Sequence, residues 1–358
     1  MFVVFSDEQY EHEPIMQMFA GRMVEAPESS NRARKLLQGA RDCGLVHMAS
    51  LDFGLAPIEE IHDSEYLEFL RSAAENWRHL RNAGPEVVPH VHPVRYLRNR
   101  PTGVMGLAGY YMNSTNCPIG PLTAKAAYAS AQTALTAAHA LADGQKFIYA
   151  LCRPPGHHAH ADLASGFCFL NNCAVAANVL LKKFSKVAII DIDVHHGNGT
   201  QEIFYLRNDV FCGSVHADPT DFYPFYQGYL NEVGEGVGHG WNLNLPLQRG
   251  SGSHEVALAT AKLIDRAKEL GCSALVIAVG LDTFAGDPMG VFQVSTAGFA
   301  EIASIIASAG LPTLLVQEGG YDGPHLQENI ASFLAPFVQA ESKNDAAGRH
   351  QTPRSVAG

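Results

Sequence analysis

Short apolar runs alternate along this chain with longer segments of helical periodicity, and no other feature of the sequence constrains the fold as much. The apolar runs are residues 2–5, 146–152, 186–191, 209–215, 274–280 and 312–318, and the helical segments include 124–144, 171–184 and 253–271. Strands separated by helices pair in parallel through right-handed crossovers, so helices cover both faces of the sheet. We therefore predict an α/β fold: a single parallel β-sheet sandwiched by helices, with the active site at the strand C-terminal ends.

The domain organisation follows from the absence of any clear division along the chain. Its 358 residues could form one large domain or two smaller ones, but no composition shift, Pro/Ser-rich linker or internal repeat separates two parts. We expect one domain over residues 1–340. The Pro- and Gly-rich loop at 81–120 is long enough to act as a lid or a partner contact. The polar tail at 341–358 should be peripheral or disordered.

Charge and cysteine usage argue against several functional classes. The formal net charge of −11 disfavours a nucleic-acid partner, which needs clustered Lys and Arg. The first ten residues lack the basic region and long apolar core of a signal peptide, and no later segment is long enough to span a membrane. The seven scattered cysteines form no CxxC pair, as is typical of small core residues in a reducing compartment. We expect a cytoplasmic protein.

Four of the predicted strands are followed at once by side chains that can do chemistry. These are His157 and His158 after the second strand, Asp191, Asp193 and His195 at the end of the third, Asp282 after the fifth and Tyr321 after the sixth. A single Asp–His pair at a strand end could equally be a hydrogen-bonded cap without a ligand. The convergence of four strand ends favours an active site, because parallel strands end at the same edge of a sheet.

Three of these side chains match the requirements of catalytic zinc. Such a site takes three protein ligands and keeps one position open, and Asp193, His195 and Asp282 can supply the three. Two carboxylates and one imidazole neutralise the dication, so it acidifies water less than an all-histidine site does. A separate base would then help to remove the proton.

The other side chains of the cluster fit the remaining roles of amide hydrolysis. His157 and His158 lie in a turn stiffened by two prolines and are candidate bases, and Asp191 can orient the far nitrogen of such a base. Tyr321 follows two glycines and can donate a hydrogen bond to the oxyanion of a tetrahedral intermediate. Each feature taken singly is more often structural, so the interpretation rests on their conjunction.

Five stretches of the sequence resemble the histone deacetylase and acetylpolyamine amidohydrolase family. They read RPPGHHA, SGFCFLNNCAVAA, DIDVHHGNGTQEIFY, GLDTFAGDPMG and EGGY, and the resemblance extends from Phe2 to about Phe337. The long loop and the HHGNGT variant resemble the bacterial acetylpolyamine amidohydrolases most closely. The resemblance implies the arginase/deacetylase fold and a zinc ion held by Asp193, His195 and Asp282. It also implies that His157 and His158 form a base and acid pair and that Tyr321 polarises the scissile carbonyl.

The same resemblance implies a tunnel, a second cation and a partner subunit. Gly166 and Phe167 would line the tunnel, with Phe225 as a further candidate for its wall. A potassium ion would lie behind the zinc, on Asp191, the main-chain oxygens of Asp193 and His195, and Ser214 with Val215. The loop at 81–120 resembles the segment that narrows the tunnel and forms a homodimer interface in the amidohydrolase branch.

Three departures from the family pattern bear on function. Asn198 stands where many deacetylases have an aspartate beside the second histidine, which should leave His158 less basic than His157. Met105 and Asn116 match positions at which polyamine-specific members carry acidic residues, and Phe167 replaces a tyrosine of some polyamine enzymes. The tunnel mouth is therefore predicted to be more apolar than that of a dedicated polyamine enzyme.

We expect a zinc-dependent amidohydrolase that acts on small N-acyl amines, resembling acetylpolyamines or acetyl-lysine. Met105 and Asn116 favour a second possibility, an amidase for small neutral or xenobiotic N-alkyl amides. A protein deacetylase fits less well, because the long loop should obstruct a folded partner. A non-catalytic acyl-amine sensor is the remaining alternative, and it is disfavoured because every expected catalytic position is filled.

Overall fold

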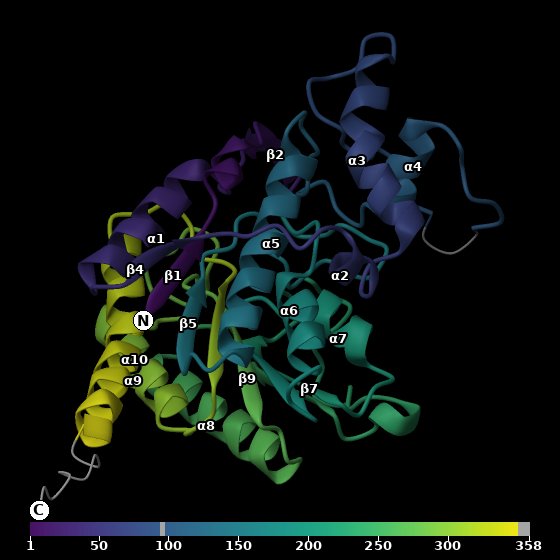
Figure 1. Ribbon diagram of the computed structural model, residues 1–358. Helices are drawn as coiled ribbons and strands as arrows, with labels where there is room; N and C mark the ends of the chain where they lie inside the picture. Colours follow the sequence, from purple (N-terminus) through teal and green to yellow (C-terminus); the bar gives the residue numbers. More distant parts are fainter. Residues whose placement is uncertain (94–96, 350–358) are drawn as a thin grey trace, which may run out of the picture.

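The computed structural model describes residues 1–93 and 97–349, and within these ranges an eight-stranded sheet forms the centre of the molecule (Figure 1). Its strands are β1 (Phe2–Phe5), β4 (Val46–Ala49), β5 (Phe147–Ala150), β6 (Val187–Asp191), β7 (Val210–Ala217), β8 (Asn242–Leu247), β9 (Ala274–Val279) and β10 (Thr313–Gln317). The strand order is β4-β1-β5-β10-β9-β6-β7-β8, and every pairing is parallel. The predicted single parallel sheet is confirmed.

The sequences of the four central strands are almost continuously apolar because both faces of these strands are covered. All residues of β5, β6, β9 and β10 are buried, as expected of parallel strands covered on both faces. Successive side chains enter opposite cores. Val187 and Ile189 pack into one hydrophobic core, and Ala188 and Ile190 into the other. These four strands are neighbours in the order β5-β10-β9-β6, so their carboxyl ends meet in the middle of one edge.

Helices cover both faces of the sheet. They are α1 (Ser30–Asp42), α2 (Ala56–Glu59), α3 (Ser64–Arg78), α4 (Val104–Tyr111), α5 (Thr123–Ala142), α6 (Asn172–Leu180), α7 (Asn198–Phe204), α8 (Ser253–Glu269), α9 (Thr296–Ala307) and α10 (Leu326–Arg349). One core packs α3 to α6 against the sheet, and the other packs α1 and α8 to α10 against the opposite face. No helix in these ranges has the length and apolar character needed to cross a bilayer.

Several elements differ from the sequence-based expectation. Strand β4 is mostly exposed at one edge and β8 carries alternating asparagines, so neither shows the apolar run of a central strand. A separate hairpin joins β2 (Met16–Phe19) to β3 (Arg22–Glu25), and short 3₁₀ helices occupy Asp7–Glu11 and Gly236–Gly238. The long loop contains α4. Residues 341–349 of the expected peripheral tail continue α10 as a helix; residues 350–358 lie outside the described ranges.

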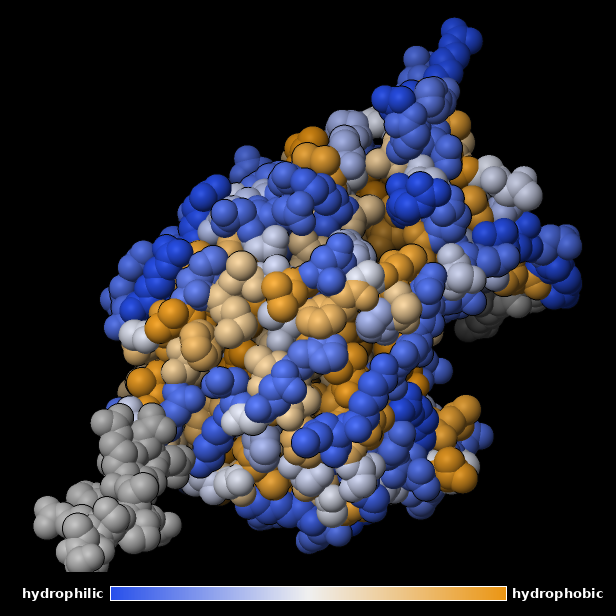
Figure 2. Space-filling view, viewed as in Figure 1, coloured by the Kyte–Doolittle hydropathy of each residue, from blue (hydrophilic) through white to orange (hydrophobic). Residues whose placement is uncertain are grey.

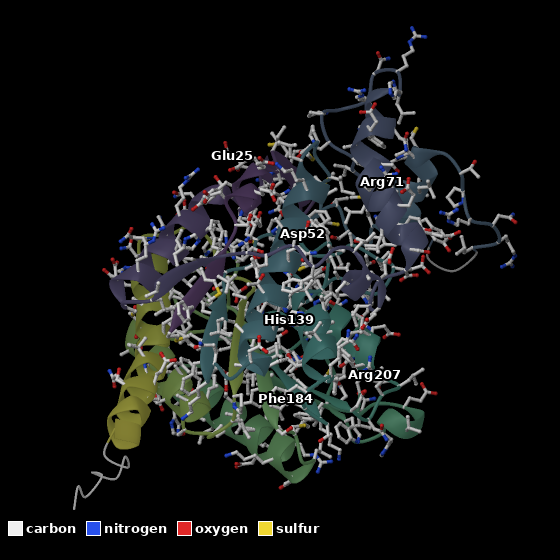
Figure 3. All side chains as sticks on the ribbon, in the orientation of Figure 1. Glu25, Asp52, Arg71, His139, Phe184 and Arg207 are labelled. Atoms are coloured by element: carbon white, nitrogen blue, oxygen red, sulfur yellow. The ribbon has the colours of Figure 1, made fainter. Side chains whose placement is uncertain are left out.

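Helices α3 and α4 project from the body of the molecule (Figure 1). Arg71 lies on this projection, whereas Glu25 lies at the end of β3 on the neighbouring edge (Figure 3). The far end of the projection is largely hydrophilic, and apolar side chains gather across the middle of the same face, around α5 (Figure 2). Helix α4, which belongs to the 81–120 segment, therefore lies on this projection and not in the compact body.

Candidate active site

Three buried side chains from two neighbouring strand ends form a group with metal-ligand chemistry. Asp193 and His195 follow β6, and Asp282 follows β9; their ligand atoms all lie within 4.8 Å of one another. His195 Nδ1 lies 3.1 Å from Asp193 Oδ1 and 3.2 Å from Asp282 Oδ2. The structure thus brings the three predicted ligands together.

Backbone groups fix the orientation of both carboxylates. Gly319 N–H donates to Asp193 Oδ2 at 2.8 Å, and Val194 N–H donates to Asp282 Oδ1 at 3.1 Å. One oxygen of each carboxylate is therefore held, and the other is directed toward His195. A Cβ at Gly319 would lie 2.1 Å from Asp282 Oδ2 and 2.4 Å from Asp193 Oδ2, so only glycine fits there.

The donor set and its spacing fit zinc. Two carboxylate oxygens and one imidazole nitrogen form a three-ligand site of the catalytic type, which leaves one position for water or substrate. Tetrahedral bonds of about 2.0–2.1 Å separate two ligand atoms by roughly 3.3 Å, close to the 3.1 and 3.2 Å found between His195 and the two aspartates. These residues could hold a zinc ion with little rearrangement.

The electrostatics of the protein atoms also favour a cation at this point. Burial and the nearby Asp193 carboxylate raise the pKa of Asp282 to about 7. Burial acts to lower the pKa of His195, but the two aspartates outweigh it and raise that pKa to about 9. Two carboxylates packed this closely away from water are stabilised by a neighbouring positive charge.

The adjacent histidines have different partners and opposite pKa shifts. His157 Nδ1 donates to Asp191 Oδ2 at 2.8 Å, and His158 Nδ1 donates to Asn198 Oδ1 at 2.7 Å. Burial opposes a charge on His157, yet Asp191 and Asp193 raise its pKa to about 10. Burial and the charges of His157 and His195 hold the pKa of His158 well below its usual value. The Asn198 contact acts in the other direction, so burial, and not the missing aspartate, is the main cause.

Glu318 holds the turn that carries both histidines. Its Oε2 accepts hydrogen bonds from Gly156 N–H at 2.6 Å and His157 N–H at 3.0 Å. Burial raises the pKa of Glu318 to about 7. Sequence reasoning missed this residue, because a glutamate before two glycines gives no sign that it reaches the end of another strand.

Tyr321 is buried beside the metal-ligand group and is positioned from both sides. Its N–H donates to Asp287 Oδ2 at 2.8 Å, its ring lies edge-on to Phe167 at 5.7 Å, and Arg32 Cζ lies 4.8 Å from the ring centroid. Burial raises the pKa of its phenol well above the usual value, so the hydroxyl stays protonated and can donate a hydrogen bond.

Aromatic rings surround these catalytic candidates. Phe167 and Gly166 form the centre of a tight turn, both with positive φ. Phe222 stacks on His195 at 4.9 Å, and Tyr223 lies edge-on to His158 at the same distance. Phe225 lies further out: it is 46% exposed, and its ring is 6.1 Å from that of Tyr223. The family resemblance suggested Phe225 as a wall residue, whereas Phe222 and Tyr223 lie nearer the histidines.

Met105 and Asn116, the two loop residues predicted to affect substrate choice, are placed differently. Met105 is 48% exposed on α4. Asn116 is half-buried, and its N–H donates to Ser114 Oγ at 3.3 Å. Ser114 Oγ also accepts from Gly166 N–H at 3.4 Å, so the Asn116 segment lies beside the turn that carries Phe167.

Two of the residues expected to hold potassium, Asp191 and Ser214, lie side by side on adjacent strands. Asp191 and Ser214 are paired across β6 and β7, and both line a small internal cavity of about 10 Å³. His216 Nε2 lies 2.8 Å from the Gly228 carbonyl and must donate to it, so His216 Nδ1 accepts the Ser214 hydroxyl proton at 2.7 Å. This leaves the lone pairs of Ser214 Oγ free for a cation.

Comparison with known proteins gives consistent similarities over most of the chain. The sequence model of the family described as Histone deacetylase domain matches residues 26–337. The chain is 40% identical over 340 residues to the acetylpolyamine amidohydrolase of Burkholderia pseudomallei, an alignment that covers 94% of this chain and 98% of that protein. It is 41% identical over 345 residues to acetylpolyamine amidohydrolase 1 of Pseudomonas aeruginosa, covering 95% and 99%. The crystal structure of an acetylpolyamine aminohydrolase from Burkholderia pseudomallei superposes with a TM-score of 0.90 at 40% identity, covering 94% of this chain and 98% of that one.

Proposed function

The chain belongs to the histone deacetylase family and is a hydrolase of amide bonds, and we propose that it deacylates small N-acyl amines at the Asp193–His195–Asp282 group. The observation that carries this proposal is the meeting of this three-ligand group with two histidines and a tyrosine at four neighbouring strand ends. A zinc ion bound by the group would supply a Lewis acid that polarises the amide carbonyl and acidifies water.

The two histidines divide the proton-transfer work. The hydrogen bonds to Asp191 and Asn198 occupy Nδ1 of each ring, so Nε2 of each is free to face a substrate. His158 has the lower pKa and is neutral, so it takes the proton of the attacking water and returns it to the leaving amine. His157 is held as an imidazolium by Asp191 and stabilises developing negative charge.

Tyr321 supplies the second stabilising contact. Its hydroxyl stays protonated and donates a hydrogen bond to the substrate oxygen as that oxygen becomes anionic. Because Asp287 anchors the Tyr321 backbone and Phe167 covers its ring, the hydroxyl is preorganised and needs little rearrangement during the reaction.

Two substrate classes follow from two different observations. The relatives named acetylpolyamine amidohydrolase favour an acetylpolyamine, whose ammonium groups lie several bonds beyond the amide. The neutral side chains of Met105 and Asn116 favour small neutral N-alkyl amides, because no carboxylate at these positions attracts an ammonium group. We expect acetylpolyamines to be accepted without strong preference over neutral amides of similar width.

A substrate panel tests the proposal. Acetylpolyamines, acetyl-lysine peptides and neutral N-alkyl acetamides are assayed with zinc-loaded protein, before and after treatment with a chelator. The proposal predicts turnover of at least one small-amine class that chelation abolishes and zinc restores. Absence of turnover on every substrate, with acyl amines still binding, would support the acyl-amine sensor.

The remaining assignments are part of the same proposal. A potassium ion on Asp191 and Ser214, with Asp193, His195 and Val215 nearby, would stiffen the loop that carries the zinc ligands. The free lone pairs of Ser214 Oγ support this assignment.

The projecting α3–α4 region supports a homodimer formed through residues 81–120 (Figure 1). Light scattering tests the homodimer, because a monomer at micromolar concentration would refute it.

The seven cysteines are all free, which supports a reducing, cytoplasmic location.

A further inference from the structure

One tight turn carries the ring that covers Tyr321. Ser165 and Cys168 exchange backbone hydrogen bonds of 3.1 and 2.8 Å, and the two residues between them, Gly166 and Phe167, have φ angles of 50° and 68°. Such a turn has one well-defined shape. The contacts that hold Ser165 therefore help to set the position of the Phe167 ring.

A tyrosine hydroxyl holds Ser165 from the other side of the site. Tyr223 Oη lies 2.6 Å from Ser165 Oγ, a hydrogen bond between two hydroxyl groups. The Tyr223 ring is half-buried and lies 4.9 Å from the His158 ring and 6.2 Å from the His195 ring. Phe167 thus flanks the site beside Tyr321, and Tyr223 flanks it beside His158 and His195.

The long loop is joined to the same turn. Asn113 N–H donates to the Ala164 carbonyl at 2.7 Å, and Ala164 N–H donates to the Tyr111 carbonyl at 2.8 Å. Gly166 N–H donates to Ser114 Oγ at 3.4 Å. Three chain segments, near residues 111–114, 164–168 and 222–225, are therefore connected by hydrogen bonds at one point.

We propose that the hydrogen bond between Tyr223 and Ser165 is a specificity-determining contact that limits the width of the amine admitted to the site. The inference rests on the proposed function, in which an N-acyl amine reaches His158 and Tyr321 between the rings of Tyr223 and Phe167. Because the bond connects Tyr223 to the turn that bears Phe167, it fixes the separation of the two rings. The contact favours an unbranched amine over one branched at the carbon next to the amide nitrogen.

The test compares an unbranched N-acetyl alkylamine with its isomer branched next to nitrogen. In Tyr223→Phe only the hydroxyl is lost, and a net hydrogen bond contributes about 0.5–1.5 kcal/mol, or roughly 2- to 10-fold. The preference for the unbranched isomer should fall by that factor, through the KM values and not through kcat of the unbranched substrate. Ser165→Ala should lower the preference in the same direction, and the two effects should not be additive in the double variant, because both substitutions remove the same Tyr223–Ser165 hydrogen bond.

Tyr128→Phe is the matched control. Its hydroxyl also bonds to a side chain, Asp52 at 2.5 Å, but on the outer surface of α5, so this variant should keep the wild-type preference. A folded Tyr223→Phe protein with unchanged preference, or additive effects of the two substitutions, would overturn the inference while leaving the amidohydrolase assignment intact. A wild-type protein that hydrolyses neither isomer and no other small N-acyl amine would instead remove the proposed function on which the inference rests.

Discussion

Replacing Gly319 by alanine should disable the metal-ligand group without altering any side chain that performs chemistry. An added Cβ would lie 2.1 Å from Asp282 Oδ2 and 2.4 Å from Asp193 Oδ2, whereas ordinary contacts begin at about 3.4 Å. The carboxylates or the turn must therefore move by about 1.0–1.3 Å (3.4 − 2.4 and 3.4 − 2.1). Gly319 does not have a left-handed φ, so the effect is steric and not a consequence of backbone strain.

A displacement of this size has a large expected effect on turnover. Misplacing catalytic groups by about 1 Å can lower the rate on the order of 100-fold, so Gly319→Ala should lose at least that factor in kcat/KM and should lose zinc on dialysis. Metal content is measured by mass spectrometry alongside turnover, with thermal unfolding as a check of folding. Gly323→Ala is the control, because its Cβ would approach nothing nearer than the Tyr321 carbonyl at 3.8 Å. A Gly319→Ala protein with full zinc and activity within a few-fold of wild type would refute this account of the carboxylate pocket.

Two further predictions concern Tyr321, whose catalytic role is proposed above, and the buried residue His62. Tyr321→Phe should lower turnover by roughly 100- to 1000-fold while zinc content stays at the wild-type level; near-normal turnover would leave the ring with a packing role only. His62 accepts from Asn171 N–H and donates to the Ala161 carbonyl, and burial lowers its pKa to about 4 from 6.5. The unfolded chain therefore binds the proton more strongly, so stability is lost as pH falls below about 6.5; between pH 7 and 4.5 His62 should account for about 2–3 kcal/mol. Denaturant unfolding of His62→Gln should show a correspondingly smaller loss, and an unchanged pH dependence would contradict the assignment.

The central strands and the residues at their ends could be predicted because both signals are local in sequence. A strand buried on both faces must be almost continuously apolar. The apolar run of β6 ends at Asp191, where charged side chains begin that cannot fill a hydrophobic core. Since parallel strands end at one edge, the order of strands and helices alone brings together residues as distant in sequence as His157 and Tyr321.

The parts that sequence did not reveal depend on contacts between distant segments. Strand β4 lies at a solvent-exposed edge, so it lacks the apolar run that marks a central strand. Glu318 acts by accepting backbone hydrogen bonds from Gly156 and His157, and backbone donors leave no trace in the sequence. Tyr223 and Phe225 are equally plausible aromatic residues in one short run. Only the fold shows that Tyr223 contacts His158 and that Phe225 lies further out.

The position of the metal ion tests the central claim most directly. Crystals of active, zinc-loaded protein are measured at the zinc absorption edge, where an anomalous difference map locates the ion independently of any interpretation of the protein density. The account predicts one zinc peak per chain, about 2.0–2.2 Å from Asp193 Oδ1, His195 Nδ1 and Asp282 Oδ2. A peak on a different set of side chains, or crystals of active protein with no zinc peak at this group, would contradict it.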